Sequence, residues 1–286
     1  MTNSLSKQKS QVGFMQGRLS PLIGGRIQAF PWKGWEQEFV EAEKMGFNLM
    51  EWTLDQEELH KNPLMTEAGQ VQIMGLSRRH GLCVPSLTGD CFMQAPFWKV
   101  EGDRKKFLER DFLLIAKACV VLGISIIVMP LVDQGRLVNR RQEDVLVGFL
   151  EKQAEYLALN SLKVAFESDF TPVELTRFIS RLNPQSFGIN YDIGNSASLG
   201  YDSKEEIEAY GNRIINVHIK DRPLGGNTVP LGEGHANIPA VFGALWAAGY
   251  RGNYILQTAR AADGDHAGVL DCYLKMALDW MNQYGA

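Results

Sequence analysis

Cysteine is scarce in this chain, with 4 in 286 residues, and no two cysteines have the CxxC spacing of a metal or redox site. Cys83, Cys119 and Cys272 lie in apolar segments, which predicts reduced, structural thiols and a cytoplasmic protein. Long apolar runs are also missing, since none approaches the roughly 18 residues that a membrane span needs.

Neither sign of charge predominates: 29 Lys and Arg oppose 33 Asp and Glu, for a formal net charge of -4. A weakly acidic chain gives no reason to expect nucleic acid or an acidic membrane as a partner. No Pro/Ser-rich linker or low-complexity tract divides the sequence. We therefore expect a flexible N-terminal tail at 1–11, which is polar, and one domain at 12–286.

Strand-like and helix-like segments alternate from residue 12 onwards. The strand-like runs are nearly continuous in apolar residues, as expected for a parallel sheet covered by helices. Eight such units predict a single (β/α)8 TIM barrel, an architecture of about 250 residues, and the alternative is an open doubly wound sheet. The expected strands are 12–15, 47–52, 82–87, 125–129, 163–168, 187–192, the start of 215–222, and 253–257. The expected helices are 34–44, 67–80, 103–122, 140–159, 172–182, 204–212, 239–248 (with Asn237 as N-cap) and 268–282, and 88–98 is expected to be a loop.

Four consecutive strand segments carry a possible metal ligand at the C-terminal end: Glu167, Asp192, His218 and Gln257. In a closed barrel these strand ends meet on one face, where active sites lie. Carboxylate oxygens and imidazole nitrogens together suit a divalent cation. Taken singly, each residue has a structural alternative, because an aspartate often caps a turn and a lone histidine in an apolar strand usually belongs to the core. Their coincidence favours a metal site.

Other polar residues near strand ends are candidate substrate contacts. Glu51 ends the second strand, where the alternative is a structural ion pair. Lys220 follows the histidine strand, and Asp221 either orients a neighbouring side chain such as His218 or binds metal. Glu233, between two glycines, contacts the site or holds its own loop together.

Three arginines, Arg18, Arg222 and Arg260, each follow a strand end. If two of them converge, the substrate carries a phosphate or a carboxylate, because the guanidinium fork matches both groups. The alternative is that they are solvated.

The sequence resembles the xylose-isomerase-like barrels, in particular the sugar-phosphate isomerase/epimerase group, over nearly its whole length. The resemblance rests on 46–51, 165–167, 191–195, 217–221, 232–234 and 249–252. It implies that Glu167, Asp192 and His218 bind a divalent cation, with Mn²⁺ preferred to Mg²⁺, Co²⁺ or Zn²⁺. It also implies a small sugar or sugar phosphate as substrate, and a homodimer or homotetramer.

Gln257 departs from this family pattern, in which a glutamate completes the metal site. An amide oxygen still binds a cation but brings no charge and takes no proton at neutral pH. This favours an isomerase with Glu167 as base and a metal-stabilised enediolate over a symmetrical epimerase. The alternatives are a lyase that dehydrates a hydroxy-keto acid, and a sugar-binding barrel that has lost catalysis.

Overall fold

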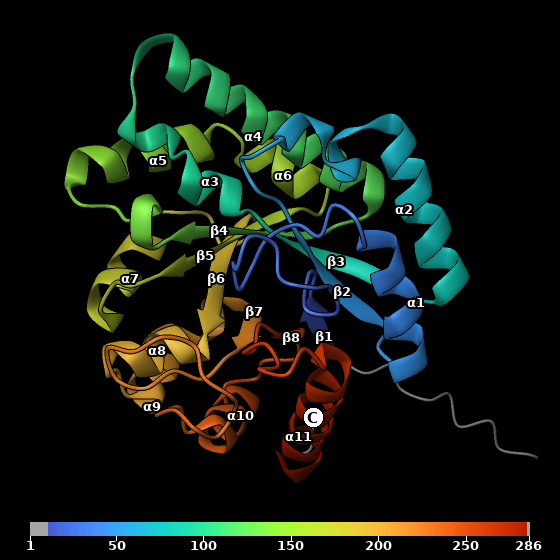
Figure 1. Cartoon of the computed structure of the whole chain (residues 1–286). Helices are drawn as coiled ribbons and strands as arrows, with labels where there is room; N and C mark the ends of the chain where they lie inside the picture. The colour runs from blue at the N-terminus through green and yellow to red at the C-terminus, as the bar shows by residue number, and fades with distance from the viewer. Residues whose placement is uncertain (1–10, 285–286) are drawn as a thin grey trace, which may run out of the picture.

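Eight parallel strands close into a barrel in the computed structural model, which describes residues 11–284 (Figure 1). Each strand pairs with the next, and the last pairs with the first. The strands are β1 Val12–Met15, β2 Leu49–Thr53, β3 Cys83–Thr88, β4 Ile126–Leu131, β5 Lys163–Ser168, β6 Phe187–Asp192, β7 Ile214–Ile219 and β8 Tyr254–Leu256. The predicted TIM barrel is confirmed. All but residue 11 of the expected tail lies outside the described residues.

The helices surround the barrel (Figure 1). They are α1 Trp35–Met45, α2 Glu67–His80, α3 Asp90–Gln94, α4 Gly102–Leu122, α5 Arg140–Glu151, α6 Ala154–Leu159, α7 Pro172–Ile179, α8 Ile193–Leu199, α9 Ser203–Tyr210, α10 Ile238–Ala247 and α11 His266–Tyr284. Short 3-10 turns are η1 Leu59–Lys61, η2 Pro63–Met65, η3 Phe97–Lys99, η4 Asp133–Gly135 and η5 Gly211–Arg213. None of these helices within 11–284 is long and apolar enough to cross a bilayer.

Three helical details differ from the sequence expectation. The single helix expected at 140–159 is two helices, because the chain leaves regular hydrogen bonding at Lys152 and Gln153 while keeping helix-like dihedral angles. The expected loop 88–98 contains α3 and η3. The short helix α8, directly after β6, was not predicted. The predicted cap of α10 is confirmed, since the side chain of Asn237 accepts from the Ala240 N–H.

The cysteines are all free, but their positions correct the sequence interpretation. Cys91 and Cys119 are buried, whereas Cys83 and Cys272 are exposed. Cys83 begins β3 and Cys272 lies on α11. The apolar neighbours of these two exposed residues in sequence therefore do not place them in the core.

Side chains alternate between the two faces of each barrel strand, with a period of two residues. On β5, Phe166 points outward and packs against Phe178 of α7, with ring centroids 5.1 Å apart. Its neighbour Glu167 therefore points into the barrel. The same alternation turns His218 of β7 inward, and Asp192 of β6 lies directly opposite His218 in the sheet register. The hydrophobic core is thus the shell between strands and helices, and the carboxyl ends of the strands enclose polar groups.

Candidate metal centre and active site

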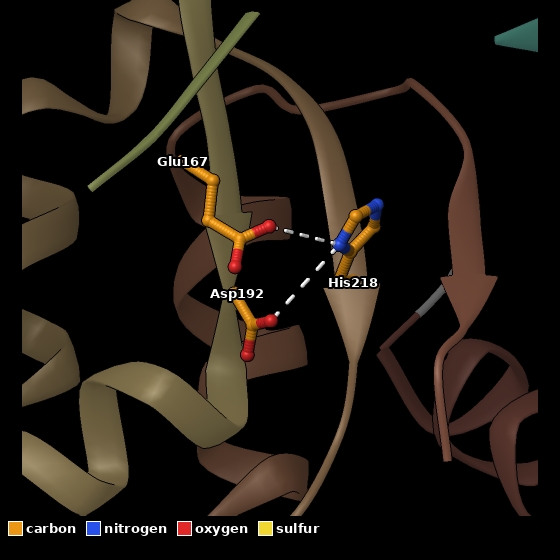
Figure 2. A group of neighbouring side chains, drawn as sticks. All are labelled: Glu167, Asp192 and His218. Atoms are coloured by element: carbon orange, nitrogen blue, oxygen red, sulfur yellow. Dashed lines mark ion pairs between the residues drawn. The ribbon is translucent and has the colours of Figure 1, made fainter. Parts of the chain in front are cut away.

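Glu167, Asp192 and His218 meet at the carboxyl ends of β5, β6 and β7. Figure 2 shows both carboxylates turned toward the imidazole. The His218 Nδ1 atom lies 3.4 Å from Glu167 Oε2 and 4.0 Å from Asp192 Oδ2. One ligand atom from each of the three lies within 4.8 Å of the others, and all three residues are buried. The sequence prediction that these residues converge is confirmed.

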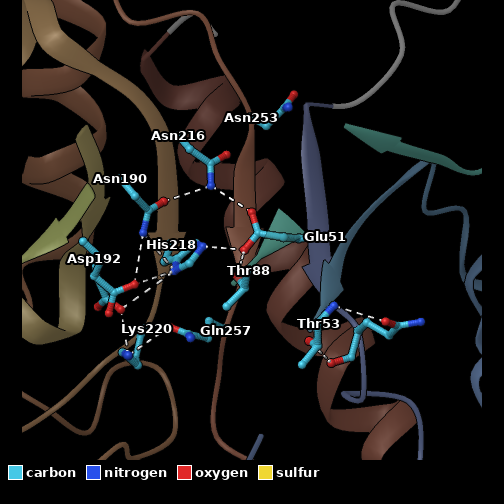
Figure 3. A network of polar contacts seen from close by, with 12 residues as sticks. Glu51, Thr53, Thr88, Asn190, Asp192, Asn216, His218, Lys220, Asn253 and Gln257 are labelled. Atoms are coloured by element: carbon cyan, nitrogen blue, oxygen red, sulfur yellow. Dashed lines mark hydrogen bonds and ion pairs between the residues drawn. The ribbon is translucent and has the colours of Figure 1, made fainter. Parts of the chain in front are cut away.

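Buried polar neighbours fix the orientation of the His218 ring (Figure 3). The Nε2 atom lies 2.7 Å from Glu51 Oε1, and the Asn216 amide donates to Glu51 Oε2 at 2.9 Å. Thr88 donates its hydroxyl to Glu51 Oε1. Asn190 Nδ2 lies 3.1 Å from His218 Nδ1. A ring that donates Nε2–H to a carboxylate presents Nδ1 as the free nitrogen, which is the usual support for a metal-bound histidine.

Two features of the surroundings have opposite effects on whether His218 Nδ1 carries a proton. Burial lowers the pKa of His218, but the Glu51 and Glu167 carboxylates outweigh burial and raise it to about 10. That pKa favours a proton on Nδ1. The amide nitrogen of Asn190 can only donate, so its contact requires Nδ1 without a proton. The raised pKa describes the cation-free site, and a bound cation would replace the proton on Nδ1.

Each carboxylate of the group is also held by its surroundings. Asn195 Nδ2 donates to Glu167 Oε1 at 2.6 Å, and Asn190 Nδ2 donates to Glu167 Oε2 at 3.2 Å. Burial raises the pKa of Glu167. The hydrogen bond with His218 and the charge of Lys220 lower this pKa by more than burial raises it, so the net shift is downward. Glu167 is therefore ionised.

Asp192 combines the two roles that the sequence left open. Its Oδ1 accepts from the Asn195 N–H at 2.8 Å and so caps α8. Its Oδ2 is buried, and Lys220 Nζ lies 2.7 Å from it. One oxygen thus caps the helix, and the other points toward Glu167 and His218.

Lys220 connects this group to β8. Its ammonium lies 2.7 Å from Asp192 Oδ2 and donates to Gln257 Oε1 at 2.9 Å (Figure 3). Gln257 therefore faces the same site, as predicted, but its oxygen accepts from the lysine. The positive charge beside Asp192 in this structure is thus the Lys220 ammonium.

The donor set fits a divalent cation. Two carboxylates and an imidazole converge, the imidazole has its other nitrogen bound by a carboxylate, and Asp192 Oδ2 is already paired with a positive charge, that of Lys220. Oxygen and nitrogen ligands of this kind suit Mn²⁺, Zn²⁺ and Co²⁺.

A cavity of about 370 Å³ opens beside this group, within the range of small-molecule sites. Among its lining residues are Gln28, Asp90, Arg136, Glu167, Asn195, Lys220, Arg222 and Gln257. Of the sequence-predicted site residues, Glu167, Lys220, Arg222 and Gln257 therefore face the cavity. Arg222 is partly engaged, because its Nη1 donates to Asn195 Oδ1 at 2.7 Å and its Nε to the Gly226 oxygen at 2.8 Å.

Glu51 takes a different place from the one expected. It has no exposed surface and lies beside the histidine rather than along the cavity. Burial raises the pKa of Glu51, but the ion pair with His218 outweighs burial and lowers it. We correct its role from substrate contact to support of the His218 ring.

The arginines Arg18 and Arg260 also have a different role. Arg18 donates to the Ile27 oxygen at 2.9 Å and to the Gln28 side chain at 3.4 Å. Arg260 donates to two backbone oxygens of the connection between β1 and α1. Neither lines the cavity. Arg18 joins two parts of this connection and Arg260 ties it to the chain after β8, which together place Gln28 beside the cavity.

Asp221 and Glu233 belong to the loop after β7. The buried Asp221 carboxylate accepts from the backbone N–H groups of Gly232, Gly234 and Ala236 at 2.9, 2.9 and 3.1 Å. It therefore holds its loop and does not orient His218. Glu233 is exposed and does not line the cavity. Their expected contacts with the site are corrected accordingly.

Sequence reasoning missed Gln28, Asp90 and Arg136. Asp90 lies just beyond β3, so the strand-end rule that identified the metal ligands would have identified it as well. Gln28 had no such signal, because it lies in a long connection. Arg136 pairs with Asp169, and both line the cavity. Asp169 directly follows β5 and so fits the strand-end rule, whereas Arg136 lies beyond η4 and does not.

Comparisons with known proteins find sequence relatives and a matching fold. A putative L-ribulose-5-phosphate 3-epimerase, SgbU, of Escherichia coli K12 is 24% identical over 243 residues, covering 78% of this chain and 83% of that protein. Inosose dehydratase of Geobacillus thermodenitrificans is 25% identical over 208 residues, covering 62% and 69%. The crystal structure of the IolI protein with a bound zinc atom matches in fold, with a TM-score of 0.72, 16% identity and coverage of 96% and 98%.

The sequence model of one family matches residues 39–283, from within α1 to within α11. With the closed barrel and the converging side chains already described, this match shows that the chain belongs to the xylose isomerase-like TIM barrel family.

Proposed function

We propose that the protein is a metal-dependent isomerase or epimerase acting on a small sugar or sugar phosphate. The observation that carries this proposal is the buried group of Glu167, Asp192 and His218 beside a cavity of about 370 Å³. Relationship to a putative sugar-phosphate epimerase supports it.

Glu167 is the proposed base. It is ionised, it faces the cavity, and two asparagine amides hold its carboxylate in place. It would remove a proton from the carbon next to the substrate carbonyl, and would return the proton at the neighbouring carbon. When bound, a divalent cation would supply positive charge for the substrate oxygens that become negative.

We propose Mn²⁺ as the resident ion, with Mg²⁺, Co²⁺ and Zn²⁺ as alternatives. Two carboxylates and one imidazole bind any of these ions, and zinc occupies the related IolI structure. Glu167, Asp192 and His218 would hold the ion, with Gln257 as a further ligand. Arg222 and Lys220, which line the cavity, are the proposed contacts for substrate oxygens or a phosphate.

The test measures metal content and proton exchange. The purified protein is analysed for bound metal and then incubated in heavy water with a panel of aldoses, ketoses and their phosphates. We expect a stoichiometric divalent ion and deuterium at the carbon next to the carbonyl. The variant Glu167→Gln should lose deuterium uptake. A protein without metal that exchanges no substrate would refute the proposal.

A dehydratase is the second candidate. Gln257 provides no carboxylate for symmetrical epimerisation, and one relative is an inosose dehydratase. A dehydratase would release water from a hydroxy-keto compound, so that the product is lighter than the substrate by one water. Deuterium uptake without loss of water would speak against it. The sugar-binding alternative and the homodimer or homotetramer remain predictions.

A further inference from the structure

Asp90 is an acidic residue of the cavity that the proposed chemistry has not used. It follows β3, is 7% exposed and lines the same cavity as Glu167. Gln28 Nε2 donates to Asp90 Oδ2 at 2.7 Å, and Gln28 Oε1 accepts from Gln257 Nε2 at 2.9 Å. A chain of two hydrogen bonds therefore joins the Asp90 carboxyl to Gln257, the residue that cannot carry a proton.

One oxygen of Asp90 is free for a ligand. Within residues 11–284, no hydrogen bond or ion pair reaches Asp90 Oδ1, and this oxygen is not sealed from solvent. The neighbouring carboxylate of Asp55 differs, because its two oxygens accept from the Phe30 N–H at 2.9 Å and from Gln94 at 2.8 Å. Asp55 is thus committed to the structure, whereas Asp90 has an oxygen available to the cavity.

The electrostatic surroundings of Asp90 favour a proton on it. Burial raises its pKa to about 7, and the charges of Asp55 and Glu167 act in the same direction, while the Gln28 hydrogen bond and His218 oppose them. The pKa of Glu167 is lowered in the same site. Two carboxyl groups with opposite shifts are typical of an acid and base pair.

We infer that Asp90 is the second proton-transferring residue of the site and exchanges its proton with substrate oxygens. The inference rests on the proposed function. In the first step Glu167 takes the proton from carbon, and the C–H electron pair forms a carbon–carbon double bond. The carbonyl π pair moves onto its oxygen, and this carbon step can reverse with a deuteron from Glu167 before Asp90 acts. The negative oxygen then takes the Asp90 proton. In the second step the Asp90 carboxylate takes the proton of the neighbouring hydroxyl, that oxygen becomes the carbonyl, and Glu167 protonates the other carbon. Both carboxyl groups return to their starting states.

The test compares two rates in Asp90→Asn, a variant that keeps the shape of the side chain and the hydrogen bond from Gln28. With the sugar that wild type exchanges fastest, deuterium uptake and conversion to product are both followed in heavy water. We expect conversion to fall about 100-fold, the range for general acid–base catalysis, while deuterium uptake falls less than 10-fold. The control is Asp111→Asn, which changes a buried aspartate of α4 outside the cavity and should alter neither rate.

Folding is checked separately, because a damaged fold also slows conversion. Thermal unfolding and Mn²⁺ titration of Asp90→Asn should match wild type. Equal conversion by Asp90→Asn and wild type would overturn the inference and leave the proposed function intact. An equal loss of conversion and deuterium uptake in a folded, Mn²⁺-binding variant would also overturn it, since Asp90 would then bind substrate. A wild-type protein that exchanges no sugar would overturn both proposals.

Discussion

In the proposed metal site Lys220 would compete with a cation, so its replacement by methionine should strengthen Mn²⁺ binding. Its ammonium lies 2.7 Å from Asp192 Oδ2 and 2.9 Å from Gln257 Oε1, and its side chain is 11% exposed. Removal of one partner from a buried ion pair costs about 3–5 kcal/mol, and the Coulomb energy of such a pair is of similar size. In Lys220→Met the protein without a cation is destabilised by this amount, because Asp192 has lost its positive partner. A bound cation would replace that partner and remove the destabilisation.

Relaxation and water entry should reduce the effect to about 1.5–3 kcal/mol, which is a factor of about 10–100 in affinity. The assay is calorimetric titration of chelator-treated protein with Mn²⁺ at neutral pH. Lys275→Met is the matched control, because Lys275 forms a similar pair with Asp271, at 2.6 Å, on the exposed surface. It should leave the affinity unchanged. Unchanged or weaker Mn²⁺ binding by folded Lys220→Met would refute the competition.

Three further changes have defined outcomes. Gln257→Glu should tighten Mn²⁺ binding about 10-fold or more, because it adds a charged ligand; an unchanged affinity would favour a barrel that has lost catalysis. Glu51→Gln should weaken Mn²⁺ binding about 10–100-fold, as loss of the partner of a metal-bound histidine does, and titration would show it. Glu143→Gln should lower the free energy of unfolding at pH 7, because it removes the ion pairs with Arg177 and Arg181. The loss should be only about 1–2 kcal/mol, because both arginines are partly exposed. Hydrogen bonding from Arg177 lowers the pKa of Glu143 to about 2, so this difference should vanish in urea unfolding as the pH falls from about 4.5 to about 2.

The fold and the ligand group could be predicted from sequence because both depend on a local pattern. Each short apolar segment predicts a strand. The residue at the C-terminal end of that strand is then expected on the catalytic face of a parallel barrel. Glu167, Asp192 and His218 all obey this rule. The same logic also includes Asp90, just beyond β3, although the sequence of 88–98 predicts only a loop.

The roles of other residues could not be predicted, because they depend on which partner each side chain meets. Arg18 and Arg260 follow strand ends, yet backbone oxygens of one connection engage both. Asp221 lies three residues after His218, but three N–H groups of its own loop engage it. Such hydrogen bonds join residues far apart or depend on loop geometry, neither of which leaves a periodic signal.

The polar network around Glu51, Asn216 and His218 lies inside the barrel, which we call the inner zone. The apolar layer between the strands and the helices is the outer zone. At the carboxyl ends of the strands the inner zone is polar, so the outer zone, where pairs such as Phe166 and Phe178 pack, contributes most of the hydrophobic stabilisation of the fold. Substitutions of similar size are therefore tolerable in the outer zone without displacement of the ligands. In the inner zone, a single apolar replacement would instead leave a buried partner unpaired and destabilise the barrel, and only replacement of the whole network by apolar groups of similar volume would stabilise it, with loss of the site.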